Sequence, residues 1–244
     1  MYVNAPRYLL RKFCVMKLIQ NVRRGKALDI GCGAGDLCET LAGKGFNVKG
    51  IDFSPEAIML CQERVKKNEP LKQKLTFQCA DLFDLRETFD LIIMCEVLEH
   101  VEQDKKFLEK IFQLLNPGGT LILSVPAHKE WFGPSDREVG HYRRYDKNEL
   151  IHLLNEKSFN TLKIWSYGVP LANITELIRS MIDSKRQHKD KIEGTKKSGI
   201  DRTIEARFRF FLNDLFLYPF YLLQFLFIST DMGTGYIVKA IKRD

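Results

Sequence analysis

The stretch Leu28–Asp36 reads LDIGCGAGD, and it decides the fold. A short apolar run is followed by Gly31-x-Gly33-x-Gly35, and a helical pattern begins at Asp36. Glycines in such a loop let the backbone turn tightly and let a ligand approach without meeting a Cβ atom. A dinucleotide-binding loop would read G-x-G-x-x-G, with a glycine at position 36. The stretch therefore predicts a strand, a ligand-binding loop and a helix that differ from the dinucleotide pattern.

Outward from this loop, short apolar runs alternate with helical patterns up to about residue 166. Such alternation predicts a parallel sheet covered by helices on both faces. The expected strands are Ala27–Ile30, Asn47–Ile51, Leu75–Gln78, Asp90–Met94, Thr120–Ser124, Thr161–Ser166 and, at the end of the chain, Gly233–Ile241. The expected helices are Asp36–Gly43, Pro55–Asn68, Asp104–Leu115 and Lys147–Glu156. Asn116–Gly119 (NPGG) should end one helix and lead into the fifth strand.

About sixty residues between the sixth and last strands exceed what a minimal α/β unit needs. We expect a helical cap there, with helices over Asn173–Lys185 and Ile204–Ile228. The predicted organisation is an N-terminal helix (1–25), a Rossmann-like core (26–167), the inserted cap (168–232) and the last strand (233–244).

Composition indicates a globular protein: of the 244 residues, 45% are hydrophobic and 28% are charged. Residues 185–209 carry nine Lys/Arg against four Asp/Glu, a net +5 of the total +7. The rest is nearly balanced, so a nucleic-acid partner is not expected. Six cysteines without C-x-x-C spacing, and an N-terminus without the apolar core of a signal peptide, predict free buried thiols and a cytoplasmic location.

Acidic residues follow or end several predicted strands. Asp29 and Asp36 make the loop pocket acidic, which repels a diphosphate and suits a ligand with an ammonium and a sulfonium centre. This favours S-adenosylmethionine (SAM) over NAD, and a NAD-dependent oxidoreductase is the disfavoured alternative. Asp52, ending the second strand, is placed to accept both ribose hydroxyls, and Asp81, ending the third, to face the adenine. Helix capping is the structural alternative for each, since Asp52 precedes Ser54 and Pro55.

Five segments together resemble the motif series of class I SAM-dependent methyltransferases: LDIGCGAGD, GIDFS, CADLFD, FDLIIMCEVLEHV and LNPGGTLILSVP. The resemblance covers residues 26–166 and implies a seven-stranded sheet that is mostly parallel, with the last strand antiparallel. Carried over by position, it implies that Asp29, Gly31, Gly33 and Gly35 cradle the methionine part. Asp52 would bind the ribose, with Phe53 beside it, and Asp81 with Leu82 would bind the adenine.

A possible metal site follows the fourth strand, in CEVLEHV. On a helical turn, Glu96, Glu99 and His100 stand at i, i+3 and i+4 and would share one face. Carboxylates with an imidazole suit Mg²⁺ or Mn²⁺, and His141 from the next loop would complete the set. The arrangement is similar to small-RNA 3′-end 2′-O-methyltransferases, which hold a divalent metal this way, and E-V-L-E-H-V to ubiquinone-pathway O-methyltransferases. The alternative is that these residues only brace the pocket wall.

The candidate catalytic residues are His141, His100 and Glu96. GHYRRY, which contains His141, precedes a helix start at Asp146. His141 would be a general base or a metal ligand, Tyr142 a hydrogen-bonding wall, and Arg143 an anchor for an anionic substrate group. Trp131 upstream suggests an aromatic lid. The structural alternative is that the arginines pair with acids and Tyr145 packs beneath the helix.

Phe208–Ile228 is dense in aromatic and leucine side chains but too interrupted to span a bilayer. It should be buried against its own core, a dimer partner or an apolar substrate, and the oligomeric state is left open. With the basic stretch upstream, residues 185–228 also fit a peripheral membrane contact.

Taken together, the sequence predicts a SAM-dependent methyltransferase acting on an oxygen of a small-molecule or lipid-like acceptor, with metal assistance. Three alternatives remain open: an N-methyltransferase on an amine or amino sugar, an RNA 3′-end 2′-O-methyltransferase, and a SAM-binding regulatory protein without turnover.

Overall fold

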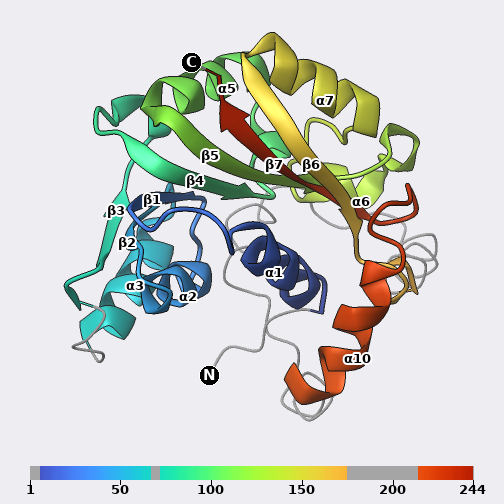
Figure 1. Cartoon of the computed structure of the whole chain (residues 1–244), viewed down its shortest axis with the longest axis horizontal. Helices are drawn as coiled ribbons and strands as arrows, with labels where there is room; N and C mark the ends of the chain where they lie inside the picture. The colour runs from blue at the N-terminus through green and yellow to red at the C-terminus, as the bar shows by residue number, and fades with distance from the viewer. Residues whose placement is uncertain (1–5, 67–71, 175–213, 244) are drawn as a thin grey trace.

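A computed structural model of the chain describes residues 6–66, 72–174 and 214–243. Its centre is a seven-stranded sheet with helices on both faces (Figure 1), which confirms the predicted Rossmann-like class. The strand order is β3-β2-β1-β4-β5-β7-β6. The strands are β1 (Lys26–Ile30), β2 (Asn47–Asp52), β3 (Leu75–Cys79), β4 (Phe89–Cys95), β5 (Leu115–Pro126), β6 (Phe159–Tyr167) and β7 (Gly235–Lys242).

The first five strands are parallel, and β7 runs antiparallel to both of its neighbours, β5 and β6. The residues of β4 show why the sheet needs two covered faces. Leu91 and Ile93 pack into the core on one side, and Ile92 and Met94 into the core on the other. A strand buried on both faces reads as a continuous apolar run, because water reaches neither side.

Three helices cover one face of the sheet and two long helices cover the other. The first face carries α1 (Pro6–Leu18), α2 (Asp36–Gly43) and α3 (Pro55–Lys66), whose apolar residues form one core cluster. The second carries α5 (Asp104–Leu114) and α7 (Lys147–Glu156). The bounds of α2 and α7 are those that the sequence predicts.

Strand β5 starts five residues earlier than predicted. Leu115, at the end of α5, already pairs with Phe89 of β4, and Asn116–Gly119 lie within the strand rather than before it. The pairing is irregular between Phe89 and Leu91, and Gly118 has a φ angle of 68°. Gly118 can adopt this left-handed conformation without strain, so the strand continues through the irregular stretch.

Most of the expected cap lies outside the described residues. That holds for 175–185 of the predicted helix Asn173–Lys185 and for residues 204–213 of the predicted helix Ile204–Ile228. The described remainder is α10 (Asp214–Phe225), which ends three residues before the predicted boundary because the chain turns after Phe225. Among the described residues, no helix is both long and apolar enough to cross a membrane.

The loops that matter lie beyond the carboxyl ends of the strands. Strand order reverses between β1 and β4, and parallel α/β sheets bind ligands in the crevice at such a switch point. The glycine loop follows β1, and the segment that begins with Glu96 follows β4. The fold therefore places the two motif groups of the sequence side by side.

Candidate active site

The glycine loop after β1 is tied to the end of β2. Gly31, Gly33 and Gly35 have φ angles of 70°, 51° and 77°, a region where a side chain strains the backbone. The N–H groups of Gly31 and Cys32 donate to the carbonyl oxygen of Ile51 at 2.9 and 3.0 Å. No atom of the described chain lies within 4 Å of the place a Cβ would take on Gly33. The loop thus presents open backbone to a ligand.

Asp52, the last residue of β2, faces this loop. Its Oδ2 accepts a hydrogen bond from the N–H of Gly33 at 2.9 Å, and its Oδ1 accepts from the N–H of Ser54 at 3.0 Å. The cap of α3 is instead the Ser54 hydroxyl, which accepts from the N–H of Ala57 at 3.2 Å. Helix capping therefore does not explain Asp52, and its carboxylate stands against the glycine loop where the ribose is expected.

The expected adenine side lies at the ends of β2 and β3. Phe53 is 74% exposed, whereas Leu82 is 3% exposed. Asp81 is exposed, and its Oδ1 accepts from the N–H of Phe83 at 2.9 Å, so it does cap the 3-10 turn Leu82–Asp84. The exposed ring of Phe53 is therefore accessible to a ligand, whereas the Leu82 side chain is part of the core. The capping role of Asp81 is compatible with its backbone or its other oxygen meeting the ligand.

Asp29 is the most deeply buried acid on the cofactor side, at 3% exposure. The thiol of Cys38 donates to its Oδ2 at 3.1 Å. Burial raises the pKa of Asp29 to about 7, with a further upward contribution from the charge of Asp52. A cation that binds beside such a buried carboxyl stabilises its ionised form. The ammonium group of SAM would be such a cation.

The acidity expected from Asp36 is compensated in the structure. Its Oδ2 accepts from the Tyr8 hydroxyl and from Nζ of Lys12, both at 2.6 Å. Although burial alone raises the pKa of Asp36, the Lys12 ammonium beside it brings the net pKa below its usual value. Asp36 is therefore larger than the glycine that a dinucleotide-binding loop carries at this position. Its negative charge, however, is balanced by Lys12 and would not repel a diphosphate. That part of the sequence argument against NAD was wrong.

The predicted shared face of Glu96, Glu99 and His100 was also wrong. Glu96 has a φ angle of 56°, and only Leu98–His100 forms a helical turn, of the 3-10 type, so spacing on an α-helix does not apply. The Glu96 carboxylate is not part of the cluster of potential metal ligands and has other partners. It accepts from Arg7 at 3.0 Å, Ser124 at 3.1 Å and Tyr167 at 2.9 Å.

Helix α1 thus supplies the cations that hold Glu96. Nη1 of Arg11 lies 3.6 Å from Oε1 of Glu96, and the Arg11 side chain is 7% exposed. Burial alone raises the pKa of Glu96, but Arg7 and Arg11 outweigh it and lower the pKa to about 2. Glu96 anchors α1 over the sheet and lies apart from the cluster of potential metal ligands.

The other three predicted ligands do come together. Ligand atoms of Glu99, His100 and His141 all lie within 4.8 Å of one another. Glu99 is fully buried, and neither of its carboxylate oxygens has a hydrogen-bond partner within the described structure. Burial, and next the negative charge of Glu96, raise the pKa of Glu99 well above its usual value. A buried carboxyl without partners costs free energy unless a proton or a cation satisfies it.

Asp136 fixes the orientation of His141. Nδ1 of His141 lies 2.8 Å from Oδ1 of Asp136, and Nε2 lies 3.9 Å from Oε1 of Glu99. Nε of Arg144 donates to both Asp136 oxygens, at 3.0 and 2.9 Å. Burial alone raises the pKa of Asp136, but hydrogen bonds from His141, Gly133 and Arg144 lower it to about 2. An ionised Asp136 only accepts, so Nδ1 of His141 carries a proton, and Nε2 is the ring nitrogen that faces Glu99.

The predicted substrate residues divide into two kinds. Trp131 and Tyr142 are 42% and 55% exposed, and the Trp131 ring packs on His128 with centroids 4.2 Å apart. Arg143 is engaged within the protein: Nη1 lies 2.8 Å from Oδ2 of Asp104, and Nη2 donates to the carbonyl of Glu102 at 2.7 Å. The two aromatics are available to a ligand, whereas an anion would have to compete with Asp104 for Arg143.

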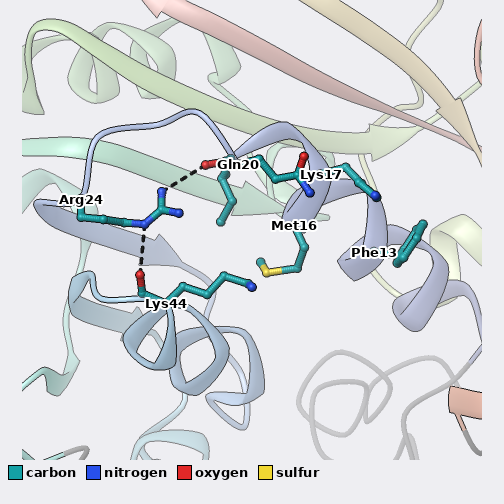
Figure 2. Close-up of a pocket in the computed structure, with 7 residues that line it drawn as sticks. Phe13, Met16, Lys17, Gln20, Arg24 and Lys44 are labelled. Atoms are coloured by element: carbon teal, nitrogen blue, oxygen red, sulfur yellow. Dashed lines mark hydrogen bonds between the residues drawn. The ribbon is translucent and has the colours of Figure 1, made fainter.

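Sequence reasoning missed Arg7, Arg11, Tyr167 and Asp136. One signal for α1 was present, since Arg7 with Arg11 and Tyr8 with Lys12 stand at i and i+4. A hollow of about 220 Å³ lies farther along α1 and is lined by Phe13, Met16, Lys17, Ile19, Gln20, Arg24 and Lys44 (Figure 2). It shares no residue with the cofactor and acceptor groups described above.

A family profile described as "Methyltransferase domain" matches residues 22–190, more than half of the chain. The chain belongs to the methyltransferase domain family. The predicted membership of the class I SAM-dependent methyltransferases is thereby confirmed.

Curated relatives of this methyltransferase domain match over a shorter region. The chain is 41% identical over 101 residues to the mitochondrial ubiquinone biosynthesis O-methyltransferase of Saccharomyces cerevisiae, which covers 40% of this chain and 32% of that protein. It is 35% identical over 106 residues to norajmaline N-methyltransferase of Rauvolfia serpentina, covering 42% and 36%. The matched region thus spans about a third of the length of these relatives.

Solved structures extend the likeness to almost the whole fold. Phosphoethanolamine N-methyltransferase 2 of Haemonchus contortus, in complex with SAM, matches with a TM-score of 0.63 at 18% identity, covering 96% of this chain and 52% of that one. The [4+2]-cyclase SpnF matches with a TM-score of 0.64 at 18% identity, covering 96% and 80%. Because a cyclase shares the fold, the fold by itself does not decide the reaction.

Proposed function

We propose that this methyltransferase domain transfers the methyl group of SAM to an oxygen of a small-molecule or lipid-like acceptor. The cofactor would lie across the glycine loop, with its ammonium group at Asp29 and its ribose at Asp52. The open backbone at Gly33 and the Asp52 carboxylate 2.9 Å from it support this placement. The curated relatives that act in ubiquinone biosynthesis support oxygen as the acceptor atom.

The single observation that carries metal assistance is the Glu99 carboxylate, buried with two unpartnered oxygens beside His100 and His141. Two imidazoles and a carboxylate are ligands that divalent cations accept, and a cation there would satisfy the buried charge. The residues present therefore fit a Mn²⁺ ion better than Mg²⁺, because two of the three ligands, Glu99, His100 and His141, are imidazoles and Mg²⁺ prefers oxygen. When bound, such an ion would polarise the acceptor oxygen and lower its pKa.

In the transfer itself, the sulfonium–methyl bond breaks with its electron pair returning to sulfur, and a new oxygen–methyl bond forms. The acceptor hydroxyl loses its proton, and S-adenosylhomocysteine, the methylated acceptor and a proton are the products. Nε2 of His141 faces Glu99 because Asp136 holds Nδ1, and the acceptor hydroxyl would bind beside this nitrogen. Without an ion, the same Nε2 atom would accept the hydroxyl proton as a general base. The metal-ligand role and the general-base role require the same orientation of His141. Activity measured with and without a chelator distinguishes the two roles.

The acceptor would meet the exposed aromatic side chains of Trp131 and Tyr142. An amine acceptor is the second candidate, favoured by the relative from Rauvolfia serpentina that is named as an N-methyltransferase. An amine must also lose a proton, so the same histidine would serve. Hydroxylated and amine acceptors must therefore be compared directly.

The test uses the full chain, SAM labelled in its methyl group, and two acceptor panels, phenols with apolar tails and the matching anilines. Labelled product from the phenol panel, lost with a chelator and restored by Mg²⁺ or Mn²⁺, is the expected result. If the amount of product is unchanged by the chelator but falls in the variant His141→Ala, metal assistance is wrong and His141 acts as a general base. Labelling of the anilines alone would overturn oxygen as the acceptor atom.

A further inference from the structure

Helix α10 has an apolar face that the described protein leaves uncovered. Its inward side packs on α1: the ring centroids of Phe225 and Phe13 lie 5.6 Å apart, and Nε2 of Gln224 donates to the carbonyl of Leu10 at 3.4 Å. Its outward side carries Leu222 and Leu223, and Leu226 follows in the turn just after the helix; these leucines are 52%, 37% and 74% exposed. The N–H of Leu226 donates to the carbonyl of Leu223 at 3.1 Å, so the turn keeps Leu226 next to Leu223, and the three leucines form one apolar stripe at the end of the helix.

Cations flank the inner edge of this stripe. Nζ of Lys17 lies 5.6 Å from the centroid of the Phe13 ring, and Nζ of Lys163 lies 5.7 Å from the Trp165 ring. Both rings contact Phe225 of α10, Trp165 with centroids 5.7 Å apart. Each lysine is thus separated from Phe225 of α10 by one aromatic side chain, so two cations lie near the helix that carries the stripe.

The positive charge extends along α1. Lys17 also lines the hollow of about 220 Å³, together with Arg24 and Lys44, and its lining contains no acidic residue (Figure 2). Arg24 donates to backbone carbonyls, at 3.0 Å to that of Lys44, which leaves its charge uncompensated by any of the lining side chains. A hollow of this charge suits an anionic headgroup.

We propose that α10 lies flat on an anionic lipid surface, with Leu222, Leu223 and Leu226 entering the acyl boundary and Lys17 and Lys163 meeting the headgroups. An exposed apolar helix face with cations nearby is the pattern of interfacial helices, and no helix of the described residues is long and apolar enough to cross a membrane. A second copy of the chain is the other occupant that an apolar stripe could take, and the test below separates it from lipid. The proposal does not depend on the chemistry at the site, and its test requires no acceptor.

The test is flotation of the full chain with vesicles of phosphatidylcholine alone and of phosphatidylcholine with about one third phosphatidylglycerol. The native chain should float with the anionic vesicles and not with the neutral ones. Leu222→Gln/Leu226→Gln should lower the partition coefficient at least tenfold, because each leucine loses its transfer to the apolar phase. The matched control Met59→Gln, which changes an exposed apolar side chain on α3, away from α10, should leave it unchanged.

Charge is tested separately. Lys17→Gln/Lys163→Gln should weaken binding about fivefold for each lysine removed, and more so at low salt. Lys26→Gln/Lys106→Gln, at exposed positions away from α10, is the control. Circular dichroism and SAM binding establish that each variant is folded. A native chain that stays with neither vesicle, or an equal loss in the controls, would overturn the proposal. So would a dimer in ultracentrifugation that the leucine variant dissociates, since a second copy would then occupy the stripe.

Discussion

Nδ1 of His141 lies 2.8 Å from Oδ1 of Asp136, and this contact decides which ring nitrogen faces Glu99. Asp136 is itself held by two hydrogen bonds from Arg144, so it is oriented and remains ionised. A carboxylate that fixes the tautomer of a histidine serves equally well for a metal ligand and for a general base.

Asp136→Asn should therefore reduce turnover by about 10²–10⁴-fold, since the amide no longer enforces a proton on Nδ1 of His141. Nitrogen chemical shifts of His141 should change from one tautomer to a mixture, a readout that a purely structural role would not move. SAM affinity should stay near that of the native chain. Glu138→Gln, an exposed acid in the same short helix α6 (Pro134–Glu138), is the control. Unchanged shifts and turnover in Asp136→Asn would refute the positioning role.

Glu99→Gln should have opposite effects on stability and on metal binding. The native carboxyl is buried without partners, so its replacement by a neutral amide should raise the free energy of unfolding of the metal-free chain by about 1–3 kcal/mol. The same change should lower Mn²⁺ affinity by at least tenfold, because one ligand loses its charge. Denaturant unfolding and paramagnetic resonance titration measure the two effects. Loss of stability without any change in Mn²⁺ binding would mean that Glu99 is structural.

SAM affinity should depend on pH through Asp29. Burial raises the pKa of Asp29 to about 7, so the free protein holds a proton there at acidic pH. A bound ammonium group favours the ionised carboxylate, so affinity should rise as the pH increases through about 7 and level off above it. Calorimetry of SAM binding at pH 6, 7 and 8 should show that the native protein releases a proton when SAM binds. The variant Asp29→Asn should release none. Asp52→Asn should weaken binding at all three pH values and move the rise in affinity to lower pH, because the charge of Asp52 helps to raise the pKa of Asp29.

The contact between α1 and β4 should be a large contributor to stability. Glu96→Gln leaves the buried Arg11 guanidinium without its carboxylate partner and should cost about 3 kcal/mol. Adding Arg11→Met should recover part of that loss, since no buried charge then remains unpaired. Glu39→Gln, which removes the half-exposed partner of Arg64, should cost less than about 1 kcal/mol. Urea unfolding of these four proteins and of the single variant Arg11→Met measures these values, and losses that add up in the double variant would contradict the pairing.

The sequence predicted the elements that local patterns determine. Helix α2 begins at Asp36 because the glycine loop ends there, and β4 is continuous in apolar residues because both of its faces are covered. The site residues on strand ends, such as Asp52, could also be placed, because parallel strands all end at one edge of the sheet. These inferences needed no contact between distant parts of the chain.

The errors concern segments whose geometry is not periodic. Glu96 was assigned to a helical face, but its backbone lies in the left-handed region, and its carboxylate is not part of the cluster that contains Glu99. Its actual partner, Arg7, is 89 positions away in the sequence. Asp136 was overlooked because its contacts with His141 and Arg144 depend on how an irregular loop folds back. Spacing rules carry no information about such contacts.

Strand β7 has a consequence for how the molecule is made. It is the last strand in chain order, yet it lies between β5 and β6, and β6 pairs with no other strand in the described structure. During synthesis β6 leaves the ribosome before β7 does. The edges of β5 and β6 that pair with β7 therefore stay unpaired until a strand more than sixty residues later is made. The glycine-loop half, β1 to β4, has all of its strands by residue 95. The nascent chain should therefore acquire the cofactor half first, and its acceptor half only when translation reaches the final strand.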